Sequence, residues 1–355
     1  MKLNWKRTLT LESKDLVGID VGSACVKAVQ LRKTAQGYNV VAAGAREIER
    51  PDENTAEPGD SRVEAVRRCV ADAGVQTSLA VCALSGPEVA VRNFSFPQLP
   101  AEEVPGAVLL EAGQVCPFSI DSCAVDYNTV SSDEGICGIL VAATNEAIER
   151  RKQIVEAAAL KCVLMDVDGL ALLNCFSGFS GNGKDGSSAE KTTAILNVGH
   201  STATLAMLGE DGLPFVRDIP IGGRNIVENA MRHSNFTAEQ VREMIHHPDD
   251  DQLKDPQRSE LLAAGSSELI NDVSETLRFY SAKGKSAVVQ TLYVCGGFAL
   301  VKGFVELLDS RLPPQVVLWN PFEQPRCSAG RSVKQFLSQH GPALAVAGGL
   351  AVRSI

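Results

Sequence analysis

Three glycine-containing turns stand where apolar strands are expected to end, and their residue types suit phosphate or nucleoside binding. The first turn is the run Gly18–Ser23, GIDVGS, with Lys27 four residues further on. A small turn lets backbone N–H groups and a Ser hydroxyl approach phosphate, a carboxylate such as Asp20 can hold Mg²⁺ or its waters, and a Lys can neutralise an oxygen. Taken by itself, this run is also that of a plain hairpin with a solvated Asp.

Two further turns have the same character. Asn197–Thr202, NVGHST, offers amides and hydroxyls where the first turn also offers an anion. Leu292–Phe298, LYVCGGF, runs from a strand into two glycines, which let a backbone press against a flat base or a ribose, with a helix beginning nearby. Together, the three turns favour a site that clamps a phosphate chain from two sides over three unrelated hairpins.

The order of elements around these turns repeats. From Leu16 the pattern predicts three strands, a helix and another strand, and the three strands and helix return from Thr192. Asp20 and Asn197 fall at equivalent turns, 197 − 20 = 177 residues apart in a chain of 355. The sequence therefore predicts a tandem duplication of one α/β unit. The Gly/Ser-rich stretch at residues 177–190 would be the flexible connector.

Each copy also contains an insertion. In the first copy it is a small α+β module with strands at Cys123–Val130 and Gly138–Ala143 between two helices, and in the second it is helical. The expected first lobe is residues 1–188, with core segments 15–91 and 161–180 and an insertion at about 92–160. The expected second lobe is residues 189–355, with core segments 189–223 and 289–355 and an insertion at about 224–288.

Composition and charge exclude several classes of protein. A formal net charge of −9 with 43 acidic residues provides no positive field for nucleic acid. The longest apolar run, Pro342–Val352, is far shorter than the roughly 20 residues of a membrane-spanning helix. The first residues lack the apolar segment of a secretory signal, and ten cysteines without a C-x-x-C pair argue against a zinc site. We therefore expect a cytoplasmic protein.

The three turns, at these spacings, resemble the phosphate-1, phosphate-2 and adenosine motifs of the superfamily of actin, sugar kinases and Hsp70. Within it, nearly the whole chain is similar to the PilM family of type IV pilus assembly, itself similar to the cell-division protein FtsA. The similarity is carried by GIDVGSACVKAVQL, FSFPQLP, IPIGGRNIVENA and the tail from NPFEQPRCSAG. It implies an α/β, actin-like two-lobed fold of duplicated ribonuclease-H-like domains, with an FtsA/PilM-type 1C subdomain.

The resemblance also implies ATP and Mg²⁺ between the lobes. It assigns to the β- and γ-phosphates and Mg²⁺ the residues Asp20, Gly22, Ser23 and Lys27, with Asp20 at the metal, and on the other side Gly199, Ser201 and Thr202. It places Gly223 and Glu228 near the ribose and Gly296, Gly297 and Phe298 around adenine. Asp168 falls where relatives orient the attacking water, although it could equally cap a helix.

One position departs from the superfamily pattern. Its second motif usually begins with Asp, and here the residue is Asn197. An amide can accept a hydrogen bond from a metal-bound water, but it brings no charge to attract the cation and cannot take up a proton. We therefore expect nucleotide binding with slow or absent hydrolysis.

PilM-like proteins bind the short cytoplasmic N-terminal segment of PilN, a single-span inner-membrane protein, in a groove associated with the 1C module. An extended segment with apolar anchors suits a small sheet or groove. The resemblance therefore implies an adaptor at the inner membrane and leaves self-association open. Candidate contacts, each with an ordinary packing or helix-end role as the alternative, are Leu109, Gln114, Val115, Pro117 and Phe118.

Two other functions share this architecture. A small-molecule kinase needs a catalytic base and a closed pocket between the lobes, and Asn197, the 1C-like module and the absence of a second obvious catalytic Asp argue against it. An FtsA-like or secretion-system adaptor would have another membrane partner. FtsA usually ends in an amphipathic membrane-targeting helix, which the tail GGLAVRSI lacks.

Overall fold

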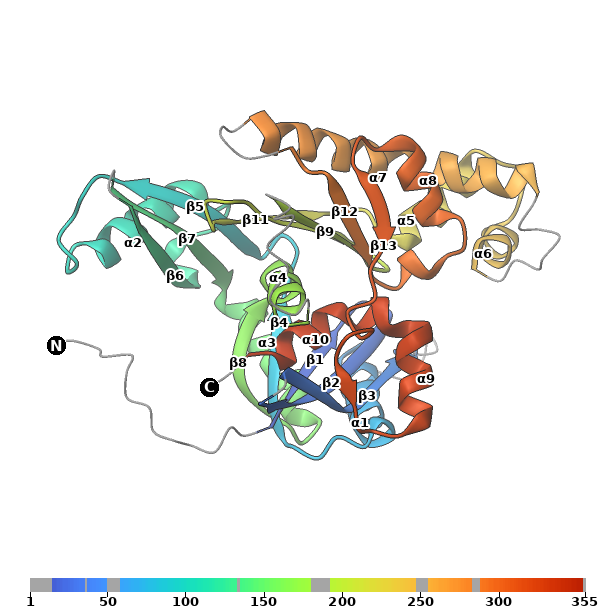
Figure 1. Ribbon diagram of the computed structural model, residues 1–355, viewed down its shortest axis with the longest axis horizontal. Helices are drawn as coiled ribbons and strands as arrows, with labels where there is room; N and C mark the ends of the chain where they lie inside the picture. Colours follow the sequence, from blue (N-terminus) through green and yellow to red (C-terminus); the bar gives the residue numbers. More distant parts are fainter. Residues whose placement is uncertain are drawn as a thin grey trace.

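Two lobes, each built around one mixed β-sheet, form the body of the protein, and a smaller sheet lies to one side (Figure 1). The computed structural model describes residues 15–35, 37–49, 58–132, 135–179, 192–246, 255–282 and 288–353. In that part of the chain, no helix is both long enough and apolar enough to cross a membrane.

The first sheet has the strand order β14-β3-β2-β1-β4-β8. Its central strand β1 is almost continuously apolar and buried, as expected of a strand covered on both faces. Strands β2 and β3 continue from β1 as an antiparallel meander, whereas β4 and β8 are parallel to it. The strands are β1 (Leu16–Val21), β2 (Cys25–Thr34), β3 (Gly37–Glu47), β4 (Leu79–Leu84), β8 (Lys161–Val167) and β14 (Arg326–Cys327).

The second sheet repeats this plan, with the order β11-β10-β9-β12-β13. A meander of three antiparallel strands again precedes two strands parallel to the first one. The expected duplication and α/β class are confirmed. The strands are β9 (Thr193–Val198), β10 (Ala203–Leu208), β11 (Pro214–Ile219), β12 (Thr291–Cys295) and β13 (Gln315–Leu318).

The third sheet belongs to the insertion in the first lobe and has the order β5-β7-β6. Its strands are β5 (Val89–Phe96), β6 (Cys123–Ser132) and β7 (Gly135–Thr144), and helix α2 (Val104–Val115) packs on them. The buried residues of α2 recur every fourth position, at Val104, Val108 and Ala112. The sequence predicted that this insertion begins at about residue 92 and predicted no strand there. Strand β5 was therefore missed.

The helices cover the sheets from outside and between the lobes. Helix α3 closes the insertion in sequence but packs its Ile154 and Val155 into the first lobe, against α1 and β4. The remaining helices are α1 (Pro58–Ala73), α3 (Asn145–Ala157), α4 (Asp168–Phe179), α5 (Gly223–Arg232), α6 (Ala238–His246), α7 (Pro256–Ala282), α8 (Phe304–Arg311), α9 (Arg331–His340) and α10 (Ala345–Ala351), with 3₁₀ turns η1 (Ile120–Ser122), η3 (Phe298–Leu300) and η4 (Gly341–Leu344).

The end of the chain returns to the first lobe, although the sequence analysis placed residues 289–355 in the second. Strand β14 pairs with β3, and α9 and α10 lie against the first sheet (Figure 1). Helix α10 is mostly Ala and Gly, and all of its residues are buried. A Cβ on Gly18 of β1 would lie 2.0 Å from the carbonyl oxygen of Ala347, so helix and strand touch through their backbones.

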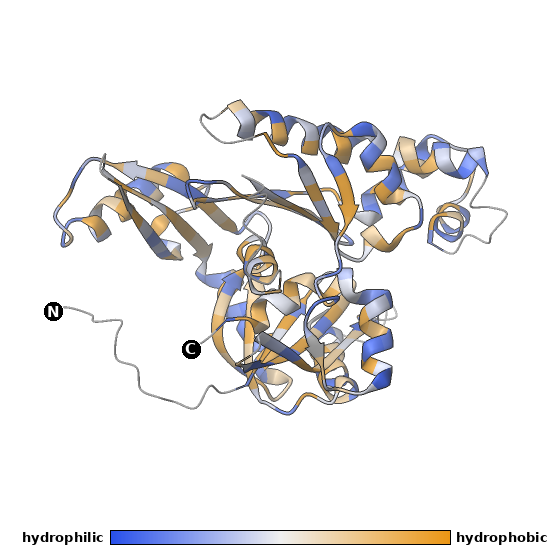
Figure 2. Ribbon diagram, in the orientation of Figure 1, coloured by the Kyte–Doolittle hydropathy of each residue, from blue (hydrophilic) through white to orange (hydrophobic). Residues whose placement is uncertain are grey.

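A shared apolar core joins the two lobes. Val81 and Leu172 of the first lobe belong to the same buried cluster as Ile195 and Ala206 of the second. Apolar residues accordingly concentrate on the central strands and on α4 (Figure 2). Helix α4 of the first lobe packs against β10 and β11 of the second, so it is part of the interface between the lobes.

Candidate functional site

The first two glycine turns have the same geometry. The N–H of Gly22 donates to the carbonyl of Cys25 at 3.1 Å, and the N–H of Gly199 donates to that of Thr202 at 2.9 Å. A Cβ on Gly22 would lie 2.9 Å from that Cys25 oxygen, and one on Gly199 would lie 3.0 Å from the Thr202 oxygen. Both turns are therefore tight enough to favour glycine, and they are duplicates of one hairpin.

The two turns meet across the boundary between the lobes. The hydroxyl of Ser201 donates to the hydroxyl of Ser23 at an oxygen–oxygen distance of 2.8 Å. Two hydroxyls from separate lobes, each on a turn with backbone amides, form a site that an anionic chain could occupy by replacing this bond.

Asp20 and Lys27 lie opposite each other on β1 and β2 at the mouth of the first turn. Their Nζ–Oδ2 distance is 3.0 Å, and their side chains are 17% and 14% exposed. Burial by itself would lower the pKa of Lys27, but the nearby Asp20 carboxylate and its hydrogen bond raise that pKa above its ordinary value. Lys27 is therefore a permanent cation at the site.

Asp168 is the first residue of α4 and faces the same region. Burial first, and then the negative charges of Asp20 and Asp218, raise the pKa of Asp168 to about 7, against a lowering by a hydrogen bond with Ser85. This carboxyl therefore changes protonation near neutral pH. Its position at the start of a helix fits both sequence readings, a helix-end residue and a group facing the cleft.

Replacing Asp168 with Asn should raise the free energy of unfolding above pH 7 by about 1–3 kcal/mol. This figure is the raised pKa of Asp168 converted to a free energy and then reduced for screening by solvent. Because the folded state binds the Asp168 proton more tightly than the unfolded chain, the stability of the parent protein falls as pH rises from about 4 to about 7. The variant lacks this fall. Thermal unfolding between pH 5 and pH 8 measures it, with exposed Asp121→Asn as control. Equal pH dependence of parent and Asp168→Asn would contradict the assignment.

The second turn is held by the start of helix α5. The N–H groups of Gly223 and Arg224 donate to the carbonyls of Gly199 and His200, at 2.9 and 2.8 Å. Glu228 lies one helical turn further on, with its side chain 47% exposed and 3.8 Å from the Arg224 guanidinium. Gly223 thus contacts the second turn directly, and Glu228 follows on the same helix; their place near a ribose stays a prediction.

The third turn packs directly on the second. A Cβ on Gly296, whose φ is +95°, would lie 2.4 Å from the carbonyl oxygen of Val198, and the Cys295 thiol donates to Asn197 Oδ1 at 3.9 Å. A Cβ on Gly297 would have no atom within 4 Å. The expected contact residues Asn197, Gly296 and Gly297 therefore lie together.

The side chain of Phe298, the next residue, is instead buried in the core of the second lobe. Its side chain is 3% exposed and its ring is edge-on to Phe304, with centroids 4.8 Å apart, in the core of the second lobe. A Cβ on Gly223 would lie 2.4 Å from this ring. The expectation that the Phe298 ring brackets adenine is corrected, because the ring fills the space beneath Gly223 and has no face open to a base.

Two polar residues beside the site, neither of them assigned to hold the nucleotide, were missed in the sequence. Asp218 accepts a hydrogen bond from the Gly86 N–H and another from the Thr204 hydroxyl, each at 2.6 Å. Arg151 of α3 donates to the carbonyl of Val21 in the first turn. Asp218 is the second-last residue of its strand, as Asp20 is of β1, and this position could have identified it. No sequence signal identifies Arg151, because it lies among other charged residues of a helix.

The candidate peptide contacts lie at the exposed side and the end of α2. Leu109 is 51% exposed, Gln114 and Pro117 are exposed, and Val115 and Phe118 are half-buried. Val115 packs against the core between α2 and its sheet, so its ordinary packing role is accounted for. The other four residues keep exposed or half-exposed side chains, and their contact with a peptide stays a prediction.

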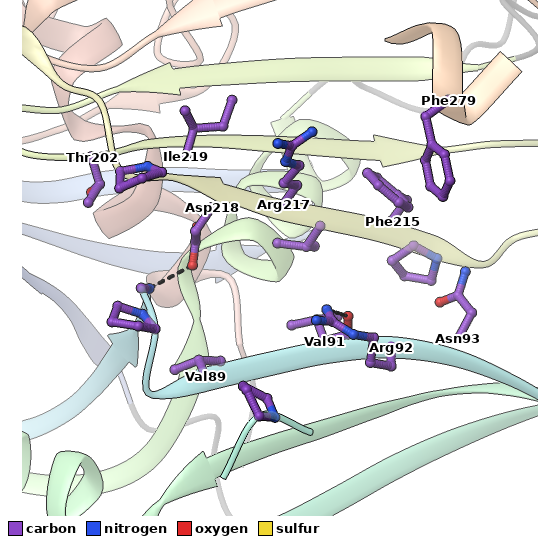
Figure 3. Close-up of a pocket in the computed structure, with 16 residues that line it drawn as sticks. Val89, Val91, Arg92, Asn93, Thr202, Phe215, Arg217, Asp218, Ile219 and Phe279 are labelled. Atoms are coloured by element: carbon purple, nitrogen blue, oxygen red, sulfur yellow. Dashed lines mark hydrogen bonds between the residues drawn. The ribbon is translucent and has the colours of Figure 1, made fainter. Parts of the chain in front are cut away.

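A cavity of about 790 Å³ lies between β5 and β11 (Figure 3). The two strands are neighbours in space, but β5 pairs only with β7 and β11 only with β10 among the described strands. The cavity is lined by apolar residues of both strands, by Arg92 and Asp218, and, among the candidate peptide contacts, by Pro117.

Asp20 is the residue that the sequence analysis expected at a magnesium ion. Over the described ranges, no three His, Cys, Asp or Glu residues gather into a cluster that could hold a metal ion by themselves. Mg²⁺ usually keeps several waters and binds through one or two carboxylates plus phosphates. The carboxylate of Asp20 therefore fits an ion brought in with a nucleotide.

Duplicated lobes, a pair of facing glycine turns and a third turn packed on the second define an actin-like protein. A family model described as type IV pilus assembly protein PilM matches residues 18–355, so the chain belongs to that family. The resemblance seen in the sequence is confirmed.

Solved structures share the fold. The chain is similar to one from a PilM-PilN type IV pilus biogenesis complex, with 22% identity, a TM-score of 0.78 and coverage of 96% of this chain and 98% of that one. The ethanolamine utilization protein EutJ from Carboxydothermus hydrogenoformans gives 15% identity, a TM-score of 0.54 and coverage of 96% and 90%. A diol dehydratase-reactivating factor in nucleotide-free form gives 10% identity, a TM-score of 0.55 and coverage of 95% and 99%.

Proposed function

We propose that this protein is an ATP-binding actin-like adaptor of type IV pilus assembly, cytoplasmic and peripheral at the inner membrane. Its partner would be the cytoplasmic N-terminal segment of a PilN-like membrane protein. The observation that carries the nucleotide part is the bond between Ser23 and Ser201, which brings the two phosphate-type turns together. Membership of the PilM family supports the adaptor role, and one structure of similar fold is from a PilM-PilN complex.

The residues around the turns fit a magnesium-bound triphosphate. The hydroxyls of Ser23 and Ser201 would exchange their mutual hydrogen bond for phosphate oxygens, together with the amides of Gly22, Gly199 and Thr202. Lys27 would offset phosphate charge, and Asp20 would hold the Mg²⁺ that accompanies the nucleotide. Gly296 and Gly297 would present backbone to the nucleoside, with Gly223 and Glu228 on the ribose side.

Slow hydrolysis follows from the same residues. Asn197 stands where a carboxylate would attract Mg²⁺, and its Oδ1 already accepts a hydrogen bond from Cys295. Asp168, with a pKa of about 7, is the group we assign to orient the attacking water, so we attribute the slow rate to Asn197. Binding without rapid turnover suits an adaptor that must hold a partner.

Replacing Asn197 with Asp should raise ATP hydrolysis by about tenfold or more, because a carboxylate helps to hold Mg²⁺ and its waters. ATP affinity should stay within about threefold of the parent, a change of less than 1 kcal/mol. Phosphate release at saturating Mg²⁺ and ATP measures the rate, and Asn128→Asp on the exposed strand β6 is the matched control. Rapid turnover by the parent protein would refute this account.

Two binding measurements test the proposed function. Native mass spectrometry of the purified protein should find ATP or ADP, and calorimetry should give a saturable ATP isotherm that requires Mg²⁺. Fluorescence anisotropy with a labelled N-terminal peptide of the PilN-like protein from the same genome should then give saturable binding. A protein that binds no nucleotide, or does not bind this peptide, contradicts the corresponding half of the proposal.

A further inference from the structure

Asp218 ties the second lobe to the loop from which the inserted sheet begins. It lies on β11 and uses both carboxylate oxygens. One accepts from the Thr204 hydroxyl of its own lobe, and the other accepts from the Gly86 N–H of the other lobe, the bond drawn as a dashed line in Figure 3. Both distances are 2.6 Å, short hydrogen bonds of the kind that charged acceptors form. Gly86 and Pro87 form the turn between β4 of the first sheet and β5 of the third.

The same carboxylate lies between the cleft and the cavity beside β5. On one side its charge is close enough to help raise the pKa of Asp168. On the other side Asp218 itself lines the 790 Å³ cavity, together with Gly86, Val89 and Val91. Asp218 therefore acts on Asp168 through its charge and lines the cavity directly.

Backbone pairing does not fix β5 to β11. The two strands do not pair, so no ladder of backbone hydrogen bonds sets their distance. Apolar packing between the lobes is not directional and allows small sliding movements. The bond from Asp218 to Gly86 is directional and charge-assisted. Pro87, with its restricted backbone, follows Gly86 immediately, so a displacement of Gly86 is passed on to β5.

We infer that Asp218 couples the nucleotide cleft to the cavity between β5 and β11. Closure of the lobes around ATP would move β11, Asp218 would carry the Gly86 turn with it, and the cavity would narrow and β5 become more rigid. This inference rests on the proposed ATP binding, and it makes a partner segment held beside β5 sensitive to the nucleotide state.

Hydrogen exchange of the full-length protein with and without Mg²⁺ and ATP tests the coupling. ATP should slow amide exchange across residues 86–96 of the parent by about fivefold or more, in the range of ordinary allosteric coupling. In Asp218→Ala this effect should nearly vanish, while ATP affinity by calorimetry stays within about threefold. Asp218→Asn keeps an oxygen that can accept from the Gly86 N–H, so ATP should still slow exchange across residues 86–96. If the charge of Asp218 served only to stabilise the fold, this variant would lose the response as Asp218→Ala does.

A second variant is used in case Asp218→Ala does not fold. Asp218→Val fills similar space with a residue that favours strands, and it too should bind ATP without the response at residues 86–96. ATP binding to the parent without slower exchange there would overturn the inference alone. So would a response in Asp218→Ala or Asp218→Val equal to that of the parent. Failure of the parent to bind ATP would overturn the proposed function, and the inference with it.

Discussion

Replacing Gly18 with Ala is expected to destabilise the protein by about 3 kcal/mol or more, a large part of the stability of an ordinary domain. The added Cβ would lie 2.0 Å from the carbonyl oxygen of Ala347 and 2.7 Å from the amide nitrogen of Ala351. Both atoms belong to the backbone of α10, so neither can move aside by a change of rotamer. Helix α10 would have to leave β1, and with it the buried contacts between the end of the chain and the first sheet.

The denaturation midpoint of purified Gly18→Ala, or its loss from the soluble fraction, measures this effect. Gly106→Ala is the matched control, because no atom lies within 4 Å of the Cβ that it adds on α2. That control should be neutral or stabilised by about 0.5–1 kcal/mol, since Ala favours helix over Gly. A Gly18→Ala protein as stable as the parent would mean that α10 does not pack on β1 as described.

Replacing Lys27 with Ala should weaken ATP binding by about 10- to 100-fold, since a hydrogen bond to a charged group contributes about 1.5–3 kcal/mol. Lys27 is held by Asp20 at 3.0 Å, and their mutual attraction keeps the ammonium charged. Removing it takes away the cation at the phosphate site and leaves the Asp20 carboxylate without its partner. Phosphate and Asp20 would then repel each other unless Mg²⁺ bridges them.

Calorimetric titration with ATP at fixed Mg²⁺ measures the loss. Lys33→Ala removes a cation from the exposed end of the same strand, β2, and should bind ATP as the parent does. Equal affinity for Lys27→Ala and Lys33→Ala would remove Lys27 from the site. Circular dichroism spectra that match the parent's would show that the loss is local.

The duplication could be predicted because each copy needs the same residue types at the same local positions. Gly22 and Gly199 each face a carbonyl three residues later, and small residues are needed at both positions for the same steric reason. An apolar strand, a tight turn and a polar residue at the strand end leave a local pattern in the sequence. This is why the three turns and the strands beside them were foreseen.

Contacts between distant segments could not be predicted in this way. Phe298 follows two glycines as a base-stacking residue would, and only the packing of Phe304 and Gly223 around its ring decides that it is buried. Strand β5 contains Arg92 and Asn93 within its apolar pattern, and both residues line a cavity. The return of α10 to β1 depends on backbone contact more than 300 residues apart in sequence.

A crystal structure of the protein with Mg²⁺ and a non-hydrolysable ATP analogue tests the central claim most directly. We predict a triphosphate between the Gly22–Ser23 and Gly199–Ser201 turns, with Lys27 on a phosphate oxygen and the hydrogen bond between Ser23 and Ser201 replaced by bonds to the ligand. An analogue bound elsewhere, or the two hydroxyls still bonded to each other at saturating analogue, would contradict the account.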